Sequence, residues 1–224
     1  MTGSLLQLSA YGKQDLHLTG NPQITFFKVV YRRHTNFSIE SIEQTIQGDT
    51  QFGNTVECSI SRSGDLISNM WVQIKLPSAP SVLTSGSYEG NPYTRWVENL
   101  GYAIIKKASF YIGGLKIDSQ ISEWFDIWNE LTDPHGFYKP LVFKQPATPI
   151  NDINKKRLYV PLQFWFNRYK GLELPLISLQ YHDVMVKLEI REIEGLLLTN
   201  SLSASANGII EEFKLFVDYI NLDN

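Results

Sequence analysis

Hydrophobic and polar residues alternate along much of this 224-residue chain. Successive side chains of a β-strand point to opposite faces, so a period of two predicts a strand with one buried face. The clearest example is 55–60, where Val56, Cys58 and Ile60 alternate with polar residues. The other runs assigned to strands are 38–46, 66–76, 104–112, 158–166, 184–190 and 213–219. The pattern therefore predicts an all-β fold.

Two of these runs and one glycine pair define the expected strands more closely. In 66–76 the even-numbered positions, from Leu66 to Leu76, are expected to face the core. In 104–112 the alternation is interrupted by Lys106. Gly113-Gly114 separates "FYI" from "LKI", which is the two-residue signal for a hairpin whose turn needs positive φ. The total is about eight strands, the number expected of an antiparallel jelly-roll sandwich.

Helical patterns are confined to two segments, so one or two short helices are expected. In "SEWFDIWNEL" (122–131), Ser122 is the predicted N-cap, and Phe125, Trp128 and Leu131 fall near one face. The second segment is "GNPQITFFKVVYRRHTNFSIESIEQTI" (20–46), in which Asn21-Pro22 is a helix-start signature. This segment predicts a short helix that leads into the first strand.

Composition and charge narrow the class of protein. Charged residues make up 19% of the chain and aromatic residues 12%, against roughly 25% charged residues in an average soluble domain. Interfaces are enriched in aromatic residues and depleted of Lys, Glu and Asp, so the composition indicates a subunit of an assembly. The net charge of −3 gives no field that would attract nucleic acid, and no direct contact with nucleic acid is expected.

The single cysteine and the N-terminal sequence argue against two other classes. Cys58 has no second cysteine with which to form an internal disulfide. The opening residues, "MTGSLLQLSAYGKQ", lack the basic start and the apolar run typical of a secretion signal. No apolar stretch approaches the roughly 18 residues that a membrane-spanning helix needs.

The sequence has none of the common motifs for catalysis or for cofactor binding. The four histidines, at 17, 34, 135 and 182, have no metal-ligand spacing, and no nucleophile elbow or phosphate loop is present. No cofactor, metal or enzymatic activity is therefore expected. One alternative stays open, because Glu123 and Asp126 beside two tryptophans could serve a glycosidase. Acidic residues in the first turn of a helix are explained more simply by the helix dipole.

Two further sites are suggested near the first strand. Arg32, Arg33 and His34 could bind an anion, although arginine more often pairs with a carboxylate at an interface. Asn36-Phe37-Ser38 matches the glycosylation sequon, which makes Asn36 a candidate for glycan attachment. The alternative for Asn36 is simply the start of a strand.

Five blocks of sequence, in order, carry a family resemblance. They are "LTGNPQITFFKVVYRRHTNFSIESIEQTI", "FGNTVECSISRSGDLISNMWVQIKL", "IGGLKIDSQISEWFDIWNEL", "RLYVPLQFWFNRYKGLELPLISLQYHDVMVKLEI" and "VDYINLD". Together they span nearly the whole chain and resemble the major capsid proteins of nucleocytoplasmic large DNA viruses, of the algal-virus and giant-virus type. The resemblance implies a double jelly roll in each chain, trimeric pseudo-hexagonal capsomers and an icosahedral shell. This sequence ends where the family's first jelly roll ends, so we expect an arm at 1–20 and a jelly-roll domain at 21–224, without the second jelly roll.

The resemblance also implies partners and a location. The family's N-terminal segment lies on the inner face of the shell, towards minor capsid proteins and an internal membrane. Leu5 and Leu6 would then belong to a contacting arm, and Tyr31, Arg32, Arg33 and His34 would lie near the base of the sandwich and contact a neighbour. The protein is expected in the virion, after assembly in the host cytoplasm.

Two alternatives to a major capsid protein remain. A minor or single-jelly-roll capsid component would share the fold. A carbohydrate-binding sandwich would need exposed aromatic rings in a planar row, for which Trp96, Trp124, Trp128 and Trp165 are the candidates.

Overall fold

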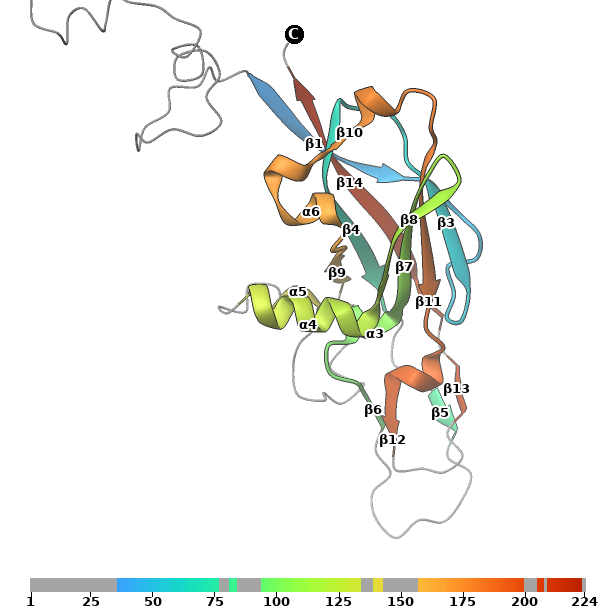
Figure 1. The fold of residues 1–224 in the computed structure, drawn as a ribbon. Coiled ribbons are helices and arrows are strands. Elements are labelled where there is room, and N and C mark those ends of the chain that lie inside the picture. Colours follow the sequence, from blue (N-terminus) through green and yellow to red (C-terminus); the bar gives the residue numbers. More distant parts are fainter. Residues whose placement is uncertain are drawn as a thin grey trace, which may run out of the picture. The chain divides into compact units, whose positions relative to one another are not determined.

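The computed structural model describes residues 36–76, 81–83, 94–133, 139–142, 157–199, 205–207 and 209–222. Those between Phe37 and Leu222 form one compact unit of two main β-sheets with a few short helices (Figure 1). The predicted N-terminal arm and the helix predicted after Asn21 lie outside the described residues, as do His17, His34 and His135.

The first sheet is entirely antiparallel. Its order is β1 (Phe37–Gln44), β14 (Glu212–Leu222) and β4 (Leu66–Lys75). The far edge of β4 pairs with two strands at different levels, β9 (Arg157–Pro161) and β10 (Leu174–Pro175). The long strand β14 therefore lies between the first described strand and β4.

The second sheet is also antiparallel. It has the order β2 (Ile46–Gln47), β3 (Thr55–Ser59), β11 (Val184–Ile190), β7 (Ile105–Ile112) and β8 (Leu115–Ile121). The predicted hairpin joins β7 to β8, and both Gly113 and Gly114 have positive φ, 58° and 81°. That prediction is confirmed.

Short elements join and extend the two sheets. They comprise the paired strands β5 (Ser81–Leu83) with β13 (Ser205–Asn207) and β6 (Thr94–Trp96) with β12 (Leu197–Thr199), the helices α3 (Leu100–Ile104), α4 (Ser122–Thr132), α5 (Lys139–Val142) and α6 (Trp165–Arg168), and the 3₁₀ turns η2 (Lys170–Leu172), η3 (Leu176–Leu179) and η4 (Ile193–Leu196).

The strand order is that of a jelly roll. Eight of the described strands have five or more residues: β1, β3, β4, β7, β8, β9, β11 and β14. Numbered one to eight along the chain, they read 1-8-3-6 in the first sheet and 2-7-4-5 in the second. Two interlocking Greek keys produce this order. The predicted fold is confirmed, although the described residues contain shorter strands beyond the eight expected.

The core lies between the two sheets, where the predicted alternation places it. Every second residue of β11 is buried, and β14 buries Phe213, Leu215, Val217 and Tyr219. All of them belong to one continuous apolar cluster. Burying apolar surface is the main favourable term in folding, so this cluster holds the two sheets together.

The predicted faces of β4 need one correction. Val217 pairs with Met70 but Tyr219 pairs with Ile67, so two residues of β4, Ser68 and Asn69, lie opposite the one residue between them on β14. Such a β-bulge shifts the alternation by one position. Ile67 is consequently buried, whereas Leu66 and Ser68, predicted to face the core, are only partly buried.

A similar irregularity explains the interruption at Lys106. Ile105 pairs with Ile190 and Lys107 with Glu189, which leaves Lys106 as the extra residue of the strand. Its side chain is exposed. The predicted strand from 104 also begins one residue later, because Ile104 ends helix α3.

The strand predicted for 158–166 ends early, at Pro161. Leu162, Phe164 and Phe166 are buried as expected, but they lie in a loop and in α6. Their alternation reflects packing, since the rings of Phe164 and Phe166 lie 5.2 and 5.0 Å from that of Phe110.

Helix α4 confirms the predicted position but not the predicted cap or face. The helix begins at Ser122 and its cap residue is Ile121, which makes no side-chain capping hydrogen bond. Ser122 Oγ instead accepts a 2.6 Å hydrogen bond from the guanidinium of Arg191. Phe125 is buried, whereas Leu131 is 72% exposed, so the buried face is narrower than predicted.

Tyr219 generates a stability prediction. It is fully buried in β14 and donates a 2.6 Å hydrogen bond to the carbonyl of Ser61. Burial raises the pKa of its hydroxyl, which therefore remains a donor. Tyr219→Phe leaves that carbonyl without this donor, so we expect a loss of about 1–2 kcal/mol in the free energy of unfolding, measured by urea titration. Tyr181→Phe, at a 93% exposed residue, is the control and should leave the midpoint unchanged; equal midpoints for both variants would contradict the assigned role.

Candidate assembly surface

The sandwich has two different ends. One, called here the turn end, carries the connections 60–65, Gly113-Gly114 and 176–183. At the opposite end, Lys75, the last residue of β4, pairs with Arg157, the first of β9. The segment that follows β4 (from 76) therefore begins next to the position where the segment that precedes β9 (up to 156) ends. These two segments are called the long insertions below.

Hydrogen bonds to the backbone hold the turn end together. The guanidinium of Arg62 donates to the carbonyls of Leu179 at 2.7 Å and His182 at 3.1 Å, and also to that of Gln180. Gly113 N donates to the carbonyl of Asp183 at 2.8 Å, which joins the hairpin to the same segment. The three connections thus form one surface.

Both ends of the described unit lie at the turn end. Phe37, at the start of β1, pairs with Leu222, at the end of β14. The backbone N–H of Leu222 donates a 2.8 Å hydrogen bond to the carboxylate of Asp65. The preceding and following parts of the chain are consequently attached here.

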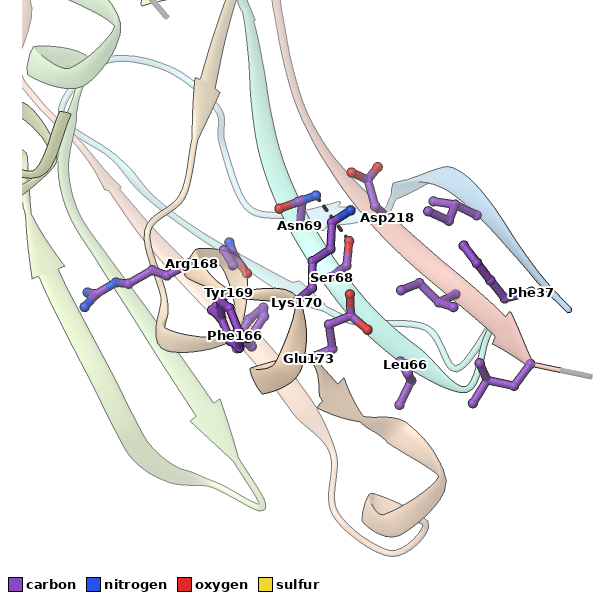
Figure 2. A pocket seen from close by; sticks show the side chains of 14 residues that line it. Phe37, Leu66, Ser68, Asn69, Phe166, Arg168, Tyr169, Lys170, Glu173 and Asp218 are labelled. Carbon is purple, nitrogen blue, oxygen red and sulfur yellow. Dashed lines mark hydrogen bonds between the residues drawn. The ribbon is translucent and has the colours of Figure 1, made fainter. Parts of the chain in front are cut away.

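A hollow of about 680 Å³ lies on the outer face of the first sheet, near the turn end. Figure 2 shows it between the strands that carry Phe37, Asp218 and Leu66 and the segment that carries Tyr169 to Glu173. Its full lining is Phe37, Ile39, Leu66, Ser68, Asn69, Phe166, Asn167, Arg168, Tyr169, Lys170, Glu173, Asp218, Ile220 and Leu222.

Cross-strand pairs make one side of the hollow apolar. Phe37 pairs with Leu222, and Ile39 pairs with Ile220, which in turn pairs with Leu66. Phe37 is 64% exposed and Ile39 59% exposed. Contiguous exposed apolar side chains mark interaction surfaces, because water contact with them is unfavourable.

The polar side chains of the hollow are partly engaged. Asp218 accepts a 3.4 Å hydrogen bond from Trp71 Nε1, and Asn69 donates to Ser68 Oγ at 3.2 Å. Burial raises the pKa of the Glu173 carboxyl, while the positive charge of Lys170 acts in the opposite direction.

Away from the turn end, the outer face of the same sheet carries ion pairs. There Lys75 forms ion pairs with Glu211 at 2.7 Å and Glu212 at 3.5 Å, and Lys214 pairs with Glu43 at 3.0 Å. Charged side chains therefore cover part of this face away from the hollow.

A second apolar surface lies on the β7–β8 hairpin. Leu115 is 71% exposed and Ile117 52% exposed. They follow directly on the Gly113-Gly114 turn and belong to β8, an edge strand of the second sheet. The structure thus carries exposed apolar residues on two strands at opposite edges.

The candidate assembly residues of the N-terminal segment precede the part of the chain that the structure describes. Leu5, Leu6, Tyr31, Arg32, Arg33 and His34 lie outside the described residues. Asn36, the candidate glycan site, is exposed immediately before β1. The sequence analysis did not predict the hollow. Phe37 and Ile39 alternate with the half-buried Ile42, so they point to the other face of β1, and this pattern could have indicated that β1 has apolar side chains on both faces.

The carboxylates considered for catalysis have structural partners. Glu123 lies 3.6 Å from the Arg191 guanidinium, and Asp126 accepts a 2.8 Å hydrogen bond from Asn99 Nδ2. The pKa of Glu123 is lowered, mainly by a hydrogen bond from its own backbone N–H and further by Ser122 and Arg191. Among the described residues, no group of three His, Cys, Asp or Glu side chains could hold a metal ion.

The tryptophans considered for sugar binding do not form a planar row. Trp96 is buried, and Trp165 packs edge-on against Phe110 at 5.4 Å. Trp124 and Trp128 pack against each other at 5.8 Å, and the Arg168 guanidinium lies 4.5 Å from the centre of the Trp128 ring. These rings are engaged within the protein.

In the part of the chain that the structure describes, no helix has the length and apolarity required to span a membrane.

Comparisons with known proteins match this chain to major capsid proteins of viruses. The sequence profile of the family described as "Major capsid protein N-terminus" matches residues 25–223. The chain is 42% identical to the major capsid protein of Phaeocystis pouchetii virus, over 100% of this chain and 49% of that protein. It is 45% identical to the major capsid protein of Pyramimonas orientalis virus, over 100% of this chain and 54% of that one. The chain thus spans about half the length of these relatives.

Among solved structures, the chain matches a quasi-atomic model of the PBCV-1 virus capsid. The TM-score is 0.66 at 34% sequence identity, and the match covers 89% of this chain and 46% of the other. A match of this kind extends the sequence similarity to the arrangement of the strands.

Glu173 generates a prediction about pH. Because its pKa is raised in the folded protein, the folded state holds this proton more tightly than the unfolded state, so ionised Glu173 lowers stability. We expect Glu173→Gln to raise the free energy of unfolding at neutral pH, with the gain disappearing as acidification protonates the wild-type carboxyl. Chemical denaturation between pH 7 and pH 4 measures this difference. Glu40→Gln, on an exposed position of β1, is the matched control; a gain for Glu173→Gln that persisted unchanged at low pH would contradict the explanation.

Proposed function

Because this chain belongs to the family defined by the N-terminal part of major capsid proteins, we propose that it is a structural subunit of a viral capsid. The observation that carries the proposal is the sequence match to major capsid proteins over the whole chain. The jelly-roll order of the strands and the exposed apolar hollow support it, since a capsid subunit must bury side surfaces against its neighbours.

We propose that the subunit assembles as trimeric, pseudo-hexagonal capsomers that contact one another in an icosahedral shell. The chain covers about half the length of these relatives. In each capsomer it would therefore supply the first of the two jelly rolls that a full-length relative supplies. The arm assigned to 1–20 and the domain assigned to 21–224 remain part of this proposal. Weak contacts repeated by symmetry are sufficient to close such a shell.

The orientation in the shell follows from the two ends of the sandwich. We propose that the turn end faces the interior, where minor capsid proteins and an inner membrane surface are the partners. The chain reaches the sandwich at Phe37, at this end, so the arm with Leu5 and Leu6 would start from the inner side. The long insertions start from the opposite end and would form the outer surface.

Glycan attachment at Asn36 and docking at the hollow would exclude each other. Asn36 immediately precedes Phe37, which lines the hollow. A bulky glycan at this position would cover the apolar side chains. We therefore expect Asn36 to carry no glycan in assembled capsids. We also propose that the capsid assembles in the host cytoplasm and that this protein remains part of the virion.

Self-association of the purified chain tests the proposed function. Multi-angle light scattering over a concentration series should show a concentration-dependent trimer, and electron microscopy should show ring-shaped particles. Ile39→Lys places a charge in the hollow and should weaken association at least about tenfold. Ile209→Lys, at a 69% exposed isoleucine outside the hollow, is the control. A wild-type chain that stays monomeric at every concentration would refute self-assembly through this domain.

A further inference from the structure

In the described part of the chain, β1 forms an open edge of the first sheet. We propose that this edge binds an extended segment of a partner protein as an additional β-strand. The segment would carry apolar and basic side chains in alternation. The inference rests on the proposed function, because that function places partner proteins at the turn end, where β1 begins. It adds the surface that receives the partner and the chemistry of the segment.

Hydrogen bonds on the far side of β14 show which backbone groups of β1 face the open edge. Asp65 N donates to the carbonyl of Ile220 at 3.0 Å, and Leu222 N donates to the Asp65 carboxylate at 2.8 Å. The polar groups of Ile220 and Leu222 therefore point away from β1. In an antiparallel pair only alternate residues exchange hydrogen bonds. Ile39, which pairs with Ile220, thus directs its N–H and C=O groups to the open edge, and so does Ser41.

The edge of β1 lacks the features that usually prevent strand addition. β1 pairs with β14 from Phe37 to Gln44 without a register shift, and it contains neither proline nor lysine. The other described edge strands differ. β8 has Ile117 as an extra residue opposite β7, with Lys116 beside it, β9 ends in Pro161, and β2 and β10 have two residues each. Proteins blunt sheet edges in these ways because a regular open edge pairs with another chain.

The outer face of β1 favours apolar side chains on the added strand. Phe37 and Ile39 lie on this face and are largely exposed. In an antiparallel pair, side chains directly opposite each other lie about 5 Å apart on the same face. Apolar residues of the added strand would therefore contact Phe37 and Ile39 from the side of the open edge. Their burial would add to the affinity that the backbone hydrogen bonds supply.

The other face of β1 favours a basic side chain. Glu40 is exposed and forms no ion pair with a described residue, whereas Glu43 pairs with Lys214 at 3.0 Å. A lysine or arginine opposite Glu40 would complete a cross-strand ion pair. A second copy of β1 does not meet this requirement, because the strand has two acidic residues and no basic one. Two such strands side by side would bring like charges together.

Hydrogen exchange of single amides, followed by NMR, tests strand addition to the purified chain. The probe is a synthetic peptide of about eight residues, the length of an ordinary strand, in which valine and lysine alternate. The amides of Ile39 and Ser41 should exchange rapidly in the chain alone. With the peptide at ten times its dissociation constant, they should exchange about tenfold more slowly. The amides of Glu40 and Ile42, which face β14, should change little.

Matched peptides and variants separate backbone pairing from simple attraction. The same peptide with N-methyl groups at the residues that face β1 lacks the backbone donors and should give no protection. Glu40→Lys should weaken binding of the unmodified peptide about tenfold, because a like-charge pair replaces a pair of opposite charges. Glu98→Lys changes the net charge equally, at an exposed residue outside β1, and should leave binding unchanged.

Other occupants of the edge would give different results. Slow exchange of the Ile39 and Ser41 amides in the dilute chain alone would mean that the edge is already filled, and slowing with chain concentration alone would mean that a second copy fills it. Either result would overturn the inference, as would equal protection by the N-methylated peptide. A chain that forms trimers in light scattering, but shows no protection with the peptide, would lose this inference and keep the proposed function.

Discussion

The central position of β14 determines how the first sheet closes over the second. This strand pairs with β1 on one edge and with β4 on the other, so the last described strand completes a sheet that the first one begins. Its buried residues, from Phe213 to Tyr219, meet the inner face of the second sheet in one apolar cluster. A shift of one residue in its pairing would turn those side chains to solvent, so burial itself specifies the register.

The same pairing creates the surface available to other chains. Because Phe37 and Leu222 are opposite each other at the turn end, the outer sides of β1 and β14 present apolar residues there. The bulge at Ser68 and Asn69 reverses the facing of β4 at this level, which turns Leu66 away from the core and into the hollow. Ion pairs around Lys75 lie on the same face, away from the turn end. The core and the proposed assembly surface thus lie on opposite faces of one sheet.

Much of the fold could be predicted from the period of two, because burial between two sheets acts on every second residue wherever a strand is regular. The predictions failed where contacts distant in sequence decide the local structure. The bulge in β4 depends on pairing with β14, and Ser122 binds Arg191 rather than capping its helix. Phe164 and Phe166 alternate because both pack on Phe110, in a loop and a helix. The hollow could not be predicted from the sequence, because its lining comes from β1, β4, β14 and the segment at 166–173. These elements are far apart in the chain and meet only in the folded sandwich.

Native-state hydrogen exchange on the purified chain tests the central role of β14 most directly. If closure by this strand holds the sandwich together, its amides facing β1 and β4 open only when the whole unit unfolds, and their protection equals the global free energy of unfolding. The slowest amides of β11, in the other sheet, should then exchange with the same free energy. Earlier exchange throughout β14, while β11 stays fully protected, would contradict this account.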